Sequence, residues 1–240
     1  MTLLNILSHH TDPVMLKQIV AESGLHPSTT HRILNAMAHS GFVERAENGS
    51  YRLGIRLLEL GSLVKSRLSL REIAVPFMLL LHNRTGESVN LGIRDADQII
   101  YVERTSSGRS AIRVVHIVGA RAPLHTTATG KLFLAEDDDR AVETYARRTG
   151  LPQVTPLSLP DLPQLLQALC TIRKDNIAYD LEEMEIGVRC IAAGIRNHEG
   201  ELVAGLSLSA PAERFDPARS SLVRQTANDI SKALGFTKEI

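Results

Sequence analysis

Residues 24 to 54 constrain the fold more than any other part of this 240-residue chain. Pro27 fits the first turn of a helix, apolar residues then recur at helical spacing, and Gly41 supplies a left-handed stop. Asn48-Gly49 lies between two short runs, 42–45 and 50–53. Because Asn-Gly tolerates the positive φ angles of a type I′ turn, these runs are predicted to pair as a two-stranded wing. The pattern is that of a winged helix-turn-helix, a module that reads DNA.

Two further helices are expected before this segment. Leu3 to Leu7 is apolar enough for a short helix. Asp12 and Pro13 are predicted to be the N-cap and first residue of a second helix, which Gly24 ends. Three helices and a wing make a complete small core, so residues 1–54 are assigned to the winged helix-turn-helix domain.

The first turns of the predicted reading helix carry the candidate DNA contacts. A capped, solvated helix start would explain the same polar residues, and the wing behind them is what favours DNA. Arginines of the wing are placed to contact the DNA backbone or the minor groove. The predicted DNA-binding residues are Ser28, Thr29, Thr30, His31 and Arg32 on the helix, and Arg45 and Arg52 on the wing.

Charge does not by itself hold this protein on nucleic acid. Lys and Arg number 27, as do Asp and Glu, and residues 1–66 carry six basic against five acidic side chains. A single copy should therefore bind double-stranded DNA weakly. Two or more copies on a repeated site would supply the missing affinity, so a dimer is expected.

The two cysteines limit other classes of protein. Cys170 and Cys190 form no Cys-x-x-Cys pair and no zinc-ligand spacing, which argues against a disulfide framework and a zinc finger. No basic leader precedes the first apolar run, and no run reaches the length of a membrane span. We expect a cytoplasmic protein without a metal or other cofactor.

The remaining chain is predicted to form a connecting helix and a second domain. Residues 55–69 are expected to be a linker and dimerisation helix, although an ordinary first helix of the next domain fits the same pattern. Residues 70–240 mix the two periodicities, as an α/β or α+β sensor domain would. Strands are predicted over 89–94, 99–105, 112–116, 188–195 and 202–209, helices over 73–82, 131–135, 138–148, 162–174 and 217–234, and a loop over 151–163.

One predicted strand has an unusual face. Leu206 and Leu208 alternate with Gly205, Ser207 and Ser209. A face of such small side chains suggests either a cavity or a closely packed neighbour, and the pattern favours neither. The turn at 197–200 should pair this strand with 188–195, which would bring Cys190 and Ala192 close to the two serines.

No catalytic constellation emerges from the motifs. The Asp180-Leu-Glu-Glu183 pattern is typical of a helix start. Amides around Thr126 to Lys131 could hold a carboxylate or phosphate at a helix start, but Leu132 replaces the Ser or Thr of a Walker loop. The chain has neither a Gly-x-Ser-x-Gly elbow nor a His-Glu-x-x-His pair. We therefore do not expect an enzyme.

Over nearly its whole length the chain resembles the IclR-type bacterial transcription regulators. The resemblance is carried by residues 23–61, by Gly187-Val-Arg-Cys-Ile-Ala-Ala-Gly-Ile-Arg followed by Gly205-Leu-Ser-Leu-Ser-Ala-Pro211, and by Pro123 to Leu132. It implies an α+β protein: an N-terminal winged helix-turn-helix, a linker helix and a C-terminal GAF-like α/β effector-binding domain, assembled as a dimer or tetramer.

The resemblance also implies a function and an effector pocket. The protein would be a regulator, most simply a repressor, whose operator binding responds to a small-molecule effector, a carboxylic acid. An enzyme that converts a small acid, or an architectural DNA binder indifferent to metabolites, are the alternatives. The implied effector-binding residues are Ala128, Thr129, Asp180, Val188, Cys190, Ser207 and Ser209, with Ala111 and Val114 as further walls.

Overall fold

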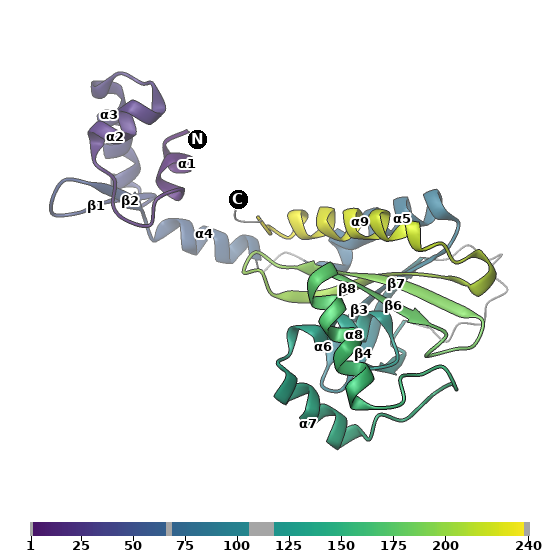
Figure 1. Cartoon of the computed structure of the whole chain (residues 1–240). Helices are drawn as coiled ribbons and strands as arrows, with labels where there is room; N and C mark the ends of the chain where they lie inside the picture. Colours follow the sequence, from purple (N-terminus) through teal and green to yellow (C-terminus); the bar gives the residue numbers. More distant parts are fainter. Residues whose placement is uncertain (1, 66–68, 106–117, 238–240) are drawn as a thin grey trace. The chain divides into compact units, whose positions relative to one another are not determined.

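The computed structural model describes residues 2–65, 69–105 and 118–237 (Figure 1). Contacts divide the chain into two compact units, Met1–Leu68 and Ser69–Ile240, and each is described by itself. Within the described ranges, no helix is long and apolar enough to cross a membrane.

The N-terminal unit is a small helical core closed by a hairpin. Its elements are α1 (Thr2–Ser8), α2 (Leu16–Ser23), α3 (Pro27–His39), β1 (Val43–Arg45), β2 (Tyr51–Leu53) and α4 (Arg56–Lys65). Pro27 occupies the first turn of α3, and Gly24 ends α2 in the left-handed conformation, as predicted. The buried apolar side chains come from every element before α4: Leu3, Ile6, Leu7, Val14, Ile19, Leu34, Val43 and Tyr51.

The predicted start of α2 at Pro13 is wrong. Val14 instead forms a β-bridge with Tyr51, in which each amide donates to the other residue's carbonyl, at 2.7 and 2.8 Å. A bridge requires extended backbone, so the helix begins only at Leu16, with Met15 as its N-cap. Val14 is thereby buried against the wing.

The wing pairs as predicted but turns differently. β1 and β2 are antiparallel, with Val43 opposite Leu53. Within 46–50 the sole positive φ is at Gly49, and the amide of Ala46 donates to the carbonyl of Ser50 at 2.9 Å. This is a three-residue loop with glycine in the left-handed position, not a type I′ turn. Asn48 uses its side chain to accept a hydrogen bond from the Ser50 amide at 3.0 Å.

The C-terminal unit is built on one antiparallel sheet with the strand order β5-β4-β3-β8-β7-β6. Its strands are β3 (Ser88–Asp95), β4 (Gln98–Thr105), β5 (Arg121–Pro123), β6 (Ile177–Leu181), β7 (Val188–Arg196) and β8 (Leu202–Pro211). Its helices are α5 (Leu70–Thr85), α6 (Ala128–Glu136), α7 (Asp139–Thr149), α8 (Leu162–Asp175) and α9 (Ser220–Ala233), with 3₁₀ turns η1 (Ala212–Arg214) and η2 (Pro217–Arg219).

Helices cover both faces of this sheet (Figure 1). On one face, α5 and α9 pack against residues such as Leu91, Ile191 and Leu206. On the other, α6 and α8 pack over Cys190 and Ala192. The alternation along β7 and β8 therefore separates two cores, and polar residues on the α6 side are buried.

Most predicted elements of this unit are present, and two strands were missed. β5 has only three residues, and β6 lies at a sheet edge with Ile177 and Ala178 both buried, so neither shows a period of two. α6 begins at Ala128, earlier than predicted, because Thr127 caps it by accepting from the Gly130 amide at 3.0 Å. The predicted strand over 112–116 lies outside the described residues.

Candidate DNA-binding surface and effector site

One face of α3 presents polar side chains to solvent. Ser28, His31 and Arg32 are exposed, and Thr29 is half-buried. The hydroxyl of Ser28 lies 2.9 Å from Nδ1 of His26, which orders the first turn. The spacing of three and four residues keeps Ser28, His31 and Arg32 on one side of the helix, as a reading face requires.

Thr30 does not belong to this surface, so its predicted DNA contact is wrong. Its side chain is 0% exposed, and its hydroxyl donates to the carbonyl of His26 at 3.2 Å. Each residue of a helix is rotated by about 100° from the one before, so five consecutive residues cannot share a face. Thr30 points into the core with Leu34.

The sequence prediction missed Asn35, which extends the exposed face of α3. Asn35 follows His31 by one helical turn, is exposed, and its Nδ2 lies 3.4 Å from the His31 ring. Asparagine can make a bidentate contact with adenine in the major groove. The spacing of four residues from His31 is the signal that could have identified it.

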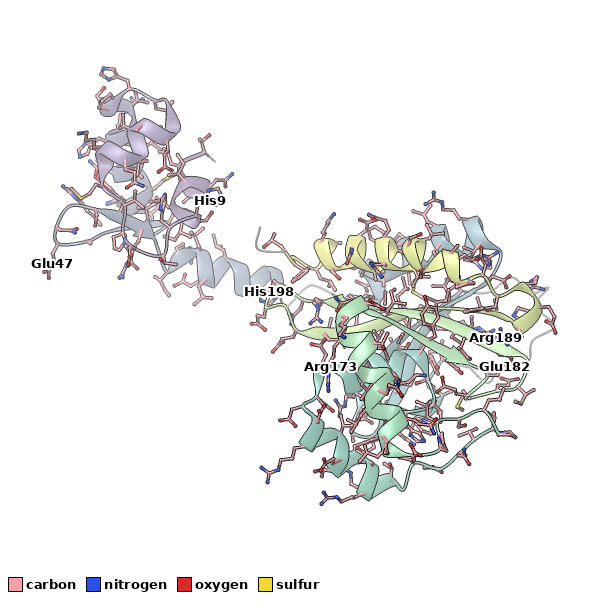
Figure 2. The ribbon with its side chains drawn as sticks, viewed as in Figure 1. His9, Glu47, Arg173, Glu182, Arg189 and His198 are labelled. Carbon is pink, nitrogen blue, oxygen red and sulfur yellow. The ribbon has the colours of Figure 1, made fainter. Side chains whose placement is uncertain are left out.

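The two wing arginines are exposed and differently held. Arg45 lies over the ring of Tyr51, with its guanidinium carbon 5.9 Å from the ring centre. Arg52 is paired with Glu44 across the hairpin at 2.8 Å. An exposed ion pair of this kind is weak, so Arg52 can exchange Glu44 for a phosphate. Glu47 lies in the loop of the wing (Figure 2).

In the C-terminal unit, three adjacent strands place predicted effector residues side by side. Asp180 of β6 stands opposite Cys190 of β7, which stands opposite Ser209 of β8. The Cys190 sulfur and the Ser209 hydroxyl are 3.1 Å apart. Ala192 stands opposite Ser207, so the predicted pairing of the two strands is confirmed. Directly opposed residues of an antiparallel pair share a face.

Asn90 of β3 joins this group and was not predicted. It stands opposite Ser207, and its Nδ2 donates to the Ser209 hydroxyl at 3.1 Å and reaches 3.5 Å from that of Ser207. Its side chain is 0% exposed. Nothing local marks position 90 except a polar residue between two buried apolar ones, Val89 and Leu91, because its partners are more than 100 residues away.

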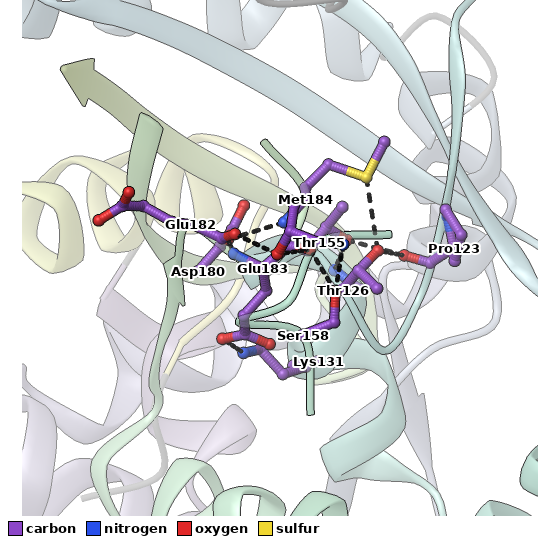
Figure 3. A network of polar contacts seen from close by, with 11 residues as sticks. Pro123, Thr126, Lys131, Thr155, Ser158, Asp180, Glu182, Glu183 and Met184 are labelled. Carbon is purple, nitrogen blue, oxygen red and sulfur yellow. Dashed lines mark hydrogen bonds and ion pairs between the residues drawn. The ribbon is translucent and has the colours of Figure 1, made fainter. Parts of the chain in front are cut away.

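Asp180 does not start a helix, although the Asp180-Leu-Glu-Glu183 pattern is typical of a helix start. It ends up buried in β6, where its carboxylate accepts from the amides of Glu183 at 2.8 Å and Met184 at 3.3 Å (Figure 3). Burial, and to a smaller extent the charge of Glu183, raise the pKa of Asp180 from 3.8 to about 7, while the charge of Lys131 and the two amides oppose the rise. Asp180 can therefore hold a proton near neutral pH.

A buried ion pair lies beside Asp180. Lys131 of α6 binds Glu183, and both side chains are almost fully buried (Figure 3). Two hydroxyl groups from the segment before α8 hold the loop that carries Glu183. The Ser158 hydroxyl donates to the Glu183 carbonyl at 2.6 Å, and the Thr155 hydroxyl donates to the Glu182 carbonyl at 2.7 Å. On the other side of the loop, Arg189 binds Glu182 at 2.8 Å (Figure 2).

Thr129 of α6 covers part of the small-residue face. A Cβ added to Gly205 would lie 2.6 Å from the Thr129 methyl carbon, and one added to Gly92 would lie 3.1 Å from it. Close helix packing thus explains the glycine of the Gly205/Ser207/Ser209 face, whereas the two serines belong to the polar group around Asn90. Ala128 and Val188 are buried in the apolar core on the same side of the sheet. Ala111 and Val114 lie outside the described residues.

Two of the hollows in the described part of this unit are lined by none of the predicted effector residues that the structure describes. One, of about 740 Å³, lies between the ends of α6, α8, β7 and α9 and includes Arg173, Arg196 and Arg224. The other, of about 450 Å³, lies beside α7. The predicted effector residues that the structure describes are buried instead. Among all the residues that the structure describes, no group of three His, Cys, Asp or Glu is placed to hold a metal ion.

A winged helix-turn-helix unit followed by a larger sheet domain is an architecture that suits a DNA-binding transcription regulator. Family models bear this out. The model described as bacterial transcriptional regulator IclR C-terminal matches residues 63–232, and that of the IclR helix-turn-helix domain matches residues 1–47. The chain belongs to the IclR family of transcriptional regulators.

Individual relatives agree over most of their length. The HTH-type transcriptional regulator XynR of Escherichia coli K12 is 32% identical over 239 residues, covering 98% of this chain and 94% of XynR. The HTH-type transcriptional repressor AllR of the same strain is 33% identical, covering 87% and 79%. An IclR homolog from Microbacterium hydrocarbonoxydans, solved in complex with 4-hydroxybenzoate, has a TM-score of 0.65 and 27% identity, covering 97% and 96%. The chain is thus a DNA-binding transcriptional regulator, and not an enzyme.

Proposed function

We propose that this regulator represses transcription from an operator and that a small carboxylic acid changes its affinity for that operator. The observation that carries the proposal is that one chain has both an exposed polar face on α3 and a buried polar group in its second unit. AllR is named a repressor, and 4-hydroxybenzoate, which the Microbacterium homolog holds, is a carboxylic acid. Residues 1–54 bind DNA, 55–69 link, and 70–240 bind the effector.

On the DNA side, Ser28, His31 and Arg32 enter the major groove, with Asn35 one turn further along α3. Arginine reads guanine through two hydrogen bonds, and the shorter side chains set the register. Thr29 lies at the margin of this face. Arg45 and Arg52 bind the backbone or the minor groove from the wing, where their charges add affinity without base specificity.

The active form is a homodimer or homotetramer. The near balance of charge in the N-terminal unit makes single-copy binding weak. Ile55 and Leu58, at the start of the linker segment, are 60% and 65% exposed. Large apolar side chains exposed next to each other favour contact with a second copy.

On the effector side, Asp180, Cys190, Ser207 and Ser209 hold the acid, and Ala128, Thr129 and Val188 surround it. Ala111 and Val114 remain further walls of the proposed pocket. A protonated Asp180 can donate a hydrogen bond to a ligand carboxylate, and the serine hydroxyls can donate as well. The acid acts on DNA binding only if it binds one arrangement of the units more tightly than another.

Fluorescence anisotropy on the DNA upstream of the gene, across a salt series and with a panel of carboxylic acids, tests this function. Arg32→Ala should weaken operator binding by roughly 10- to 100-fold, since a lost base contact costs about 1–3 kcal/mol. Arg147→Ala, on α7 of the other unit, is the matched control and should leave it unchanged.

The acid response has its own variant. Ser207→Val with Ser209→Val should keep operator binding and abolish the effect of the acid. Operator binding that no acid shifts would favour the architectural alternative, and equal affinity for unrelated DNA would contradict operator recognition.

A further inference from the structure

Four buried residues of the effector domain, Asn90, Ser209, Cys190 and Asp180, form a continuous line across four strands. Asn90 donates to Ser209, Ser209 contacts Cys190, and Asp180 stands opposite Cys190. Asp180 in turn accepts from the amide of Glu183. The line therefore runs from β3 through β8, β7 and β6 to the loop that follows β6.

Both ends of this line carry an oxygen without a partner. Within the described residues, Oδ1 of Asn90 and Oε2 of Glu183 are buried and accept no hydrogen bond. The hydroxyl of Thr129, on the helix above the sheet, is likewise unbonded. A buried polar atom left unpaired costs about 1–3 kcal/mol, so such atoms usually meet a partner supplied by a ligand or by water.

The chemistry of the two oxygens limits that partner. An amide oxygen and a carboxylate oxygen only accept hydrogen bonds. The carboxylate of an acid effector also only accepts, so it cannot satisfy either oxygen. A hydroxyl or N–H group can satisfy one, because it donates.

We infer that Asn90 is a specificity-determining residue of the effector site, and that the effector carries a hydroxyl or N–H group, beside its acid group, that donates to the Asn90 amide oxygen. The inference rests on the effector site proposed above. The Ser207 and Ser209 hydroxyls accept from Nδ2 of Asn90 and fix the plane of its amide group. Oδ1 of Asn90 therefore remains available to accept a hydrogen bond from the ligand. Acids without a donor leave this oxygen unpaired and bind more weakly.

Isothermal titration calorimetry of the full-length protein with matched acids tests the inference. Suitable pairs are 4-hydroxybenzoate with benzoate, lactate with propionate, and glycolate with acetate, in which one member lacks the hydroxyl. In at least one pair the hydroxy acid should bind wild type about tenfold more tightly, the worth of one buried hydrogen bond.

Variants at position 90 attribute that preference to Asn90. Asn90→Ala should bring the affinity ratio of the pair close to one while changing the affinity for the hydroxyl-free acid by less than about twofold. Asn90→Asp keeps an acceptor oxygen and should keep the preference. Asn228→Ala, which removes an exposed asparagine from α9, is the matched control and should behave as wild type. Circular dichroism confirms that each variant is folded. If the alanine variant is not, Asn90→Leu, which is of similar size and has no acceptor oxygen, takes its place and should also bring the affinity ratio close to one.

The outcomes separate the inference from the proposed function. The role of Asn90 is contradicted if the acids bind without any hydroxyl preference, if the preference survives Asn90→Ala, or if it disappears with Asn90→Asp. In these cases the acid site itself is retained, provided that Ser207→Val with Ser209→Val still abolishes binding. Binding that survives the two serine replacements places the site elsewhere. If none of the six acids binds wild type, the proposed acid effector and the inference both fail.

Discussion

Replacing Asp180 with asparagine should stabilise the protein, by an amount that grows between pH 5 and pH 8. The amide oxygen of asparagine can still accept from the backbone N–H groups of Glu183 and Met184, which lie 2.8 and 3.3 Å from the carboxylate. The substitution therefore keeps the local hydrogen bonds and removes only the titration of a side chain that is 3% exposed.

The size and sign follow from the raised pKa. Burial, as the largest cause, moves the pKa of Asp180 from 3.8 to about 7 in the folded protein. From about pH 4 to pH 7 the folded state keeps a proton that the unfolded chain has lost, so the free energy of unfolding falls as the pH rises. One pKa unit corresponds to about 1.4 kcal/mol, so the whole window costs wild type about 4 kcal/mol, of which about 3 kcal/mol falls between pH 5 and pH 8.

Urea unfolding at pH 5, 6, 7 and 8, followed by circular dichroism at one protein concentration, measures this difference. Asp180→Asn should be about 1–2 kcal/mol more stable than wild type at pH 5 and about 4 kcal/mol more stable at pH 8. Asp175→Asn, which removes an exposed carboxylate at the end of α8, is the control and should show no such trend. A difference between Asp180→Asn and wild type that stays constant with pH would refute the reasoning.

Three further predictions concern packing and charge. Thr30→Val should leave operator affinity within about twofold in anisotropy, because Thr30 is buried; a large loss would return it to the reading face. Gly205→Ala should destabilise the second unit by about 1–3 kcal/mol in urea, since its Cβ would lie 2.6 Å from the Thr129 methyl, and Thr129→Ser should recover part of the loss; an unchanged midpoint would contradict the contact. Glu44→Ala frees Arg52 and should raise operator affinity severalfold at low salt and less at high salt, whereas a fall would mean that the pair positions Arg52.

Local rules of the backbone let the sequence determine the elements of this protein. Gly24 ends α2 because glycine permits a positive φ, and Pro27 begins α3 because proline fixes φ near the helical value. Both effects are independent of the surrounding structure. The alternation along β7 and β8 fixed which side chains share a face, and so placed Cys190 beside Ser209 before any tertiary contact was known. Where both faces are buried, as in β6, alternation disappears and the strand was missed.

The tertiary structure decided everything that depends on a partner distant in sequence. Val14 is extended because Tyr51 pairs with it, and Thr30 faces inward because the core lies on that side of α3. Asn90 meets Ser209 across 119 residues, and Lys131 meets Glu183 across 52. The raised pKa of Asp180 has the same origin, since it comes from burial rather than from the Asp-Leu-Glu-Glu motif. Periodicity describes a segment alone, whereas strand register, burial and electric fields arise only when segments pack together.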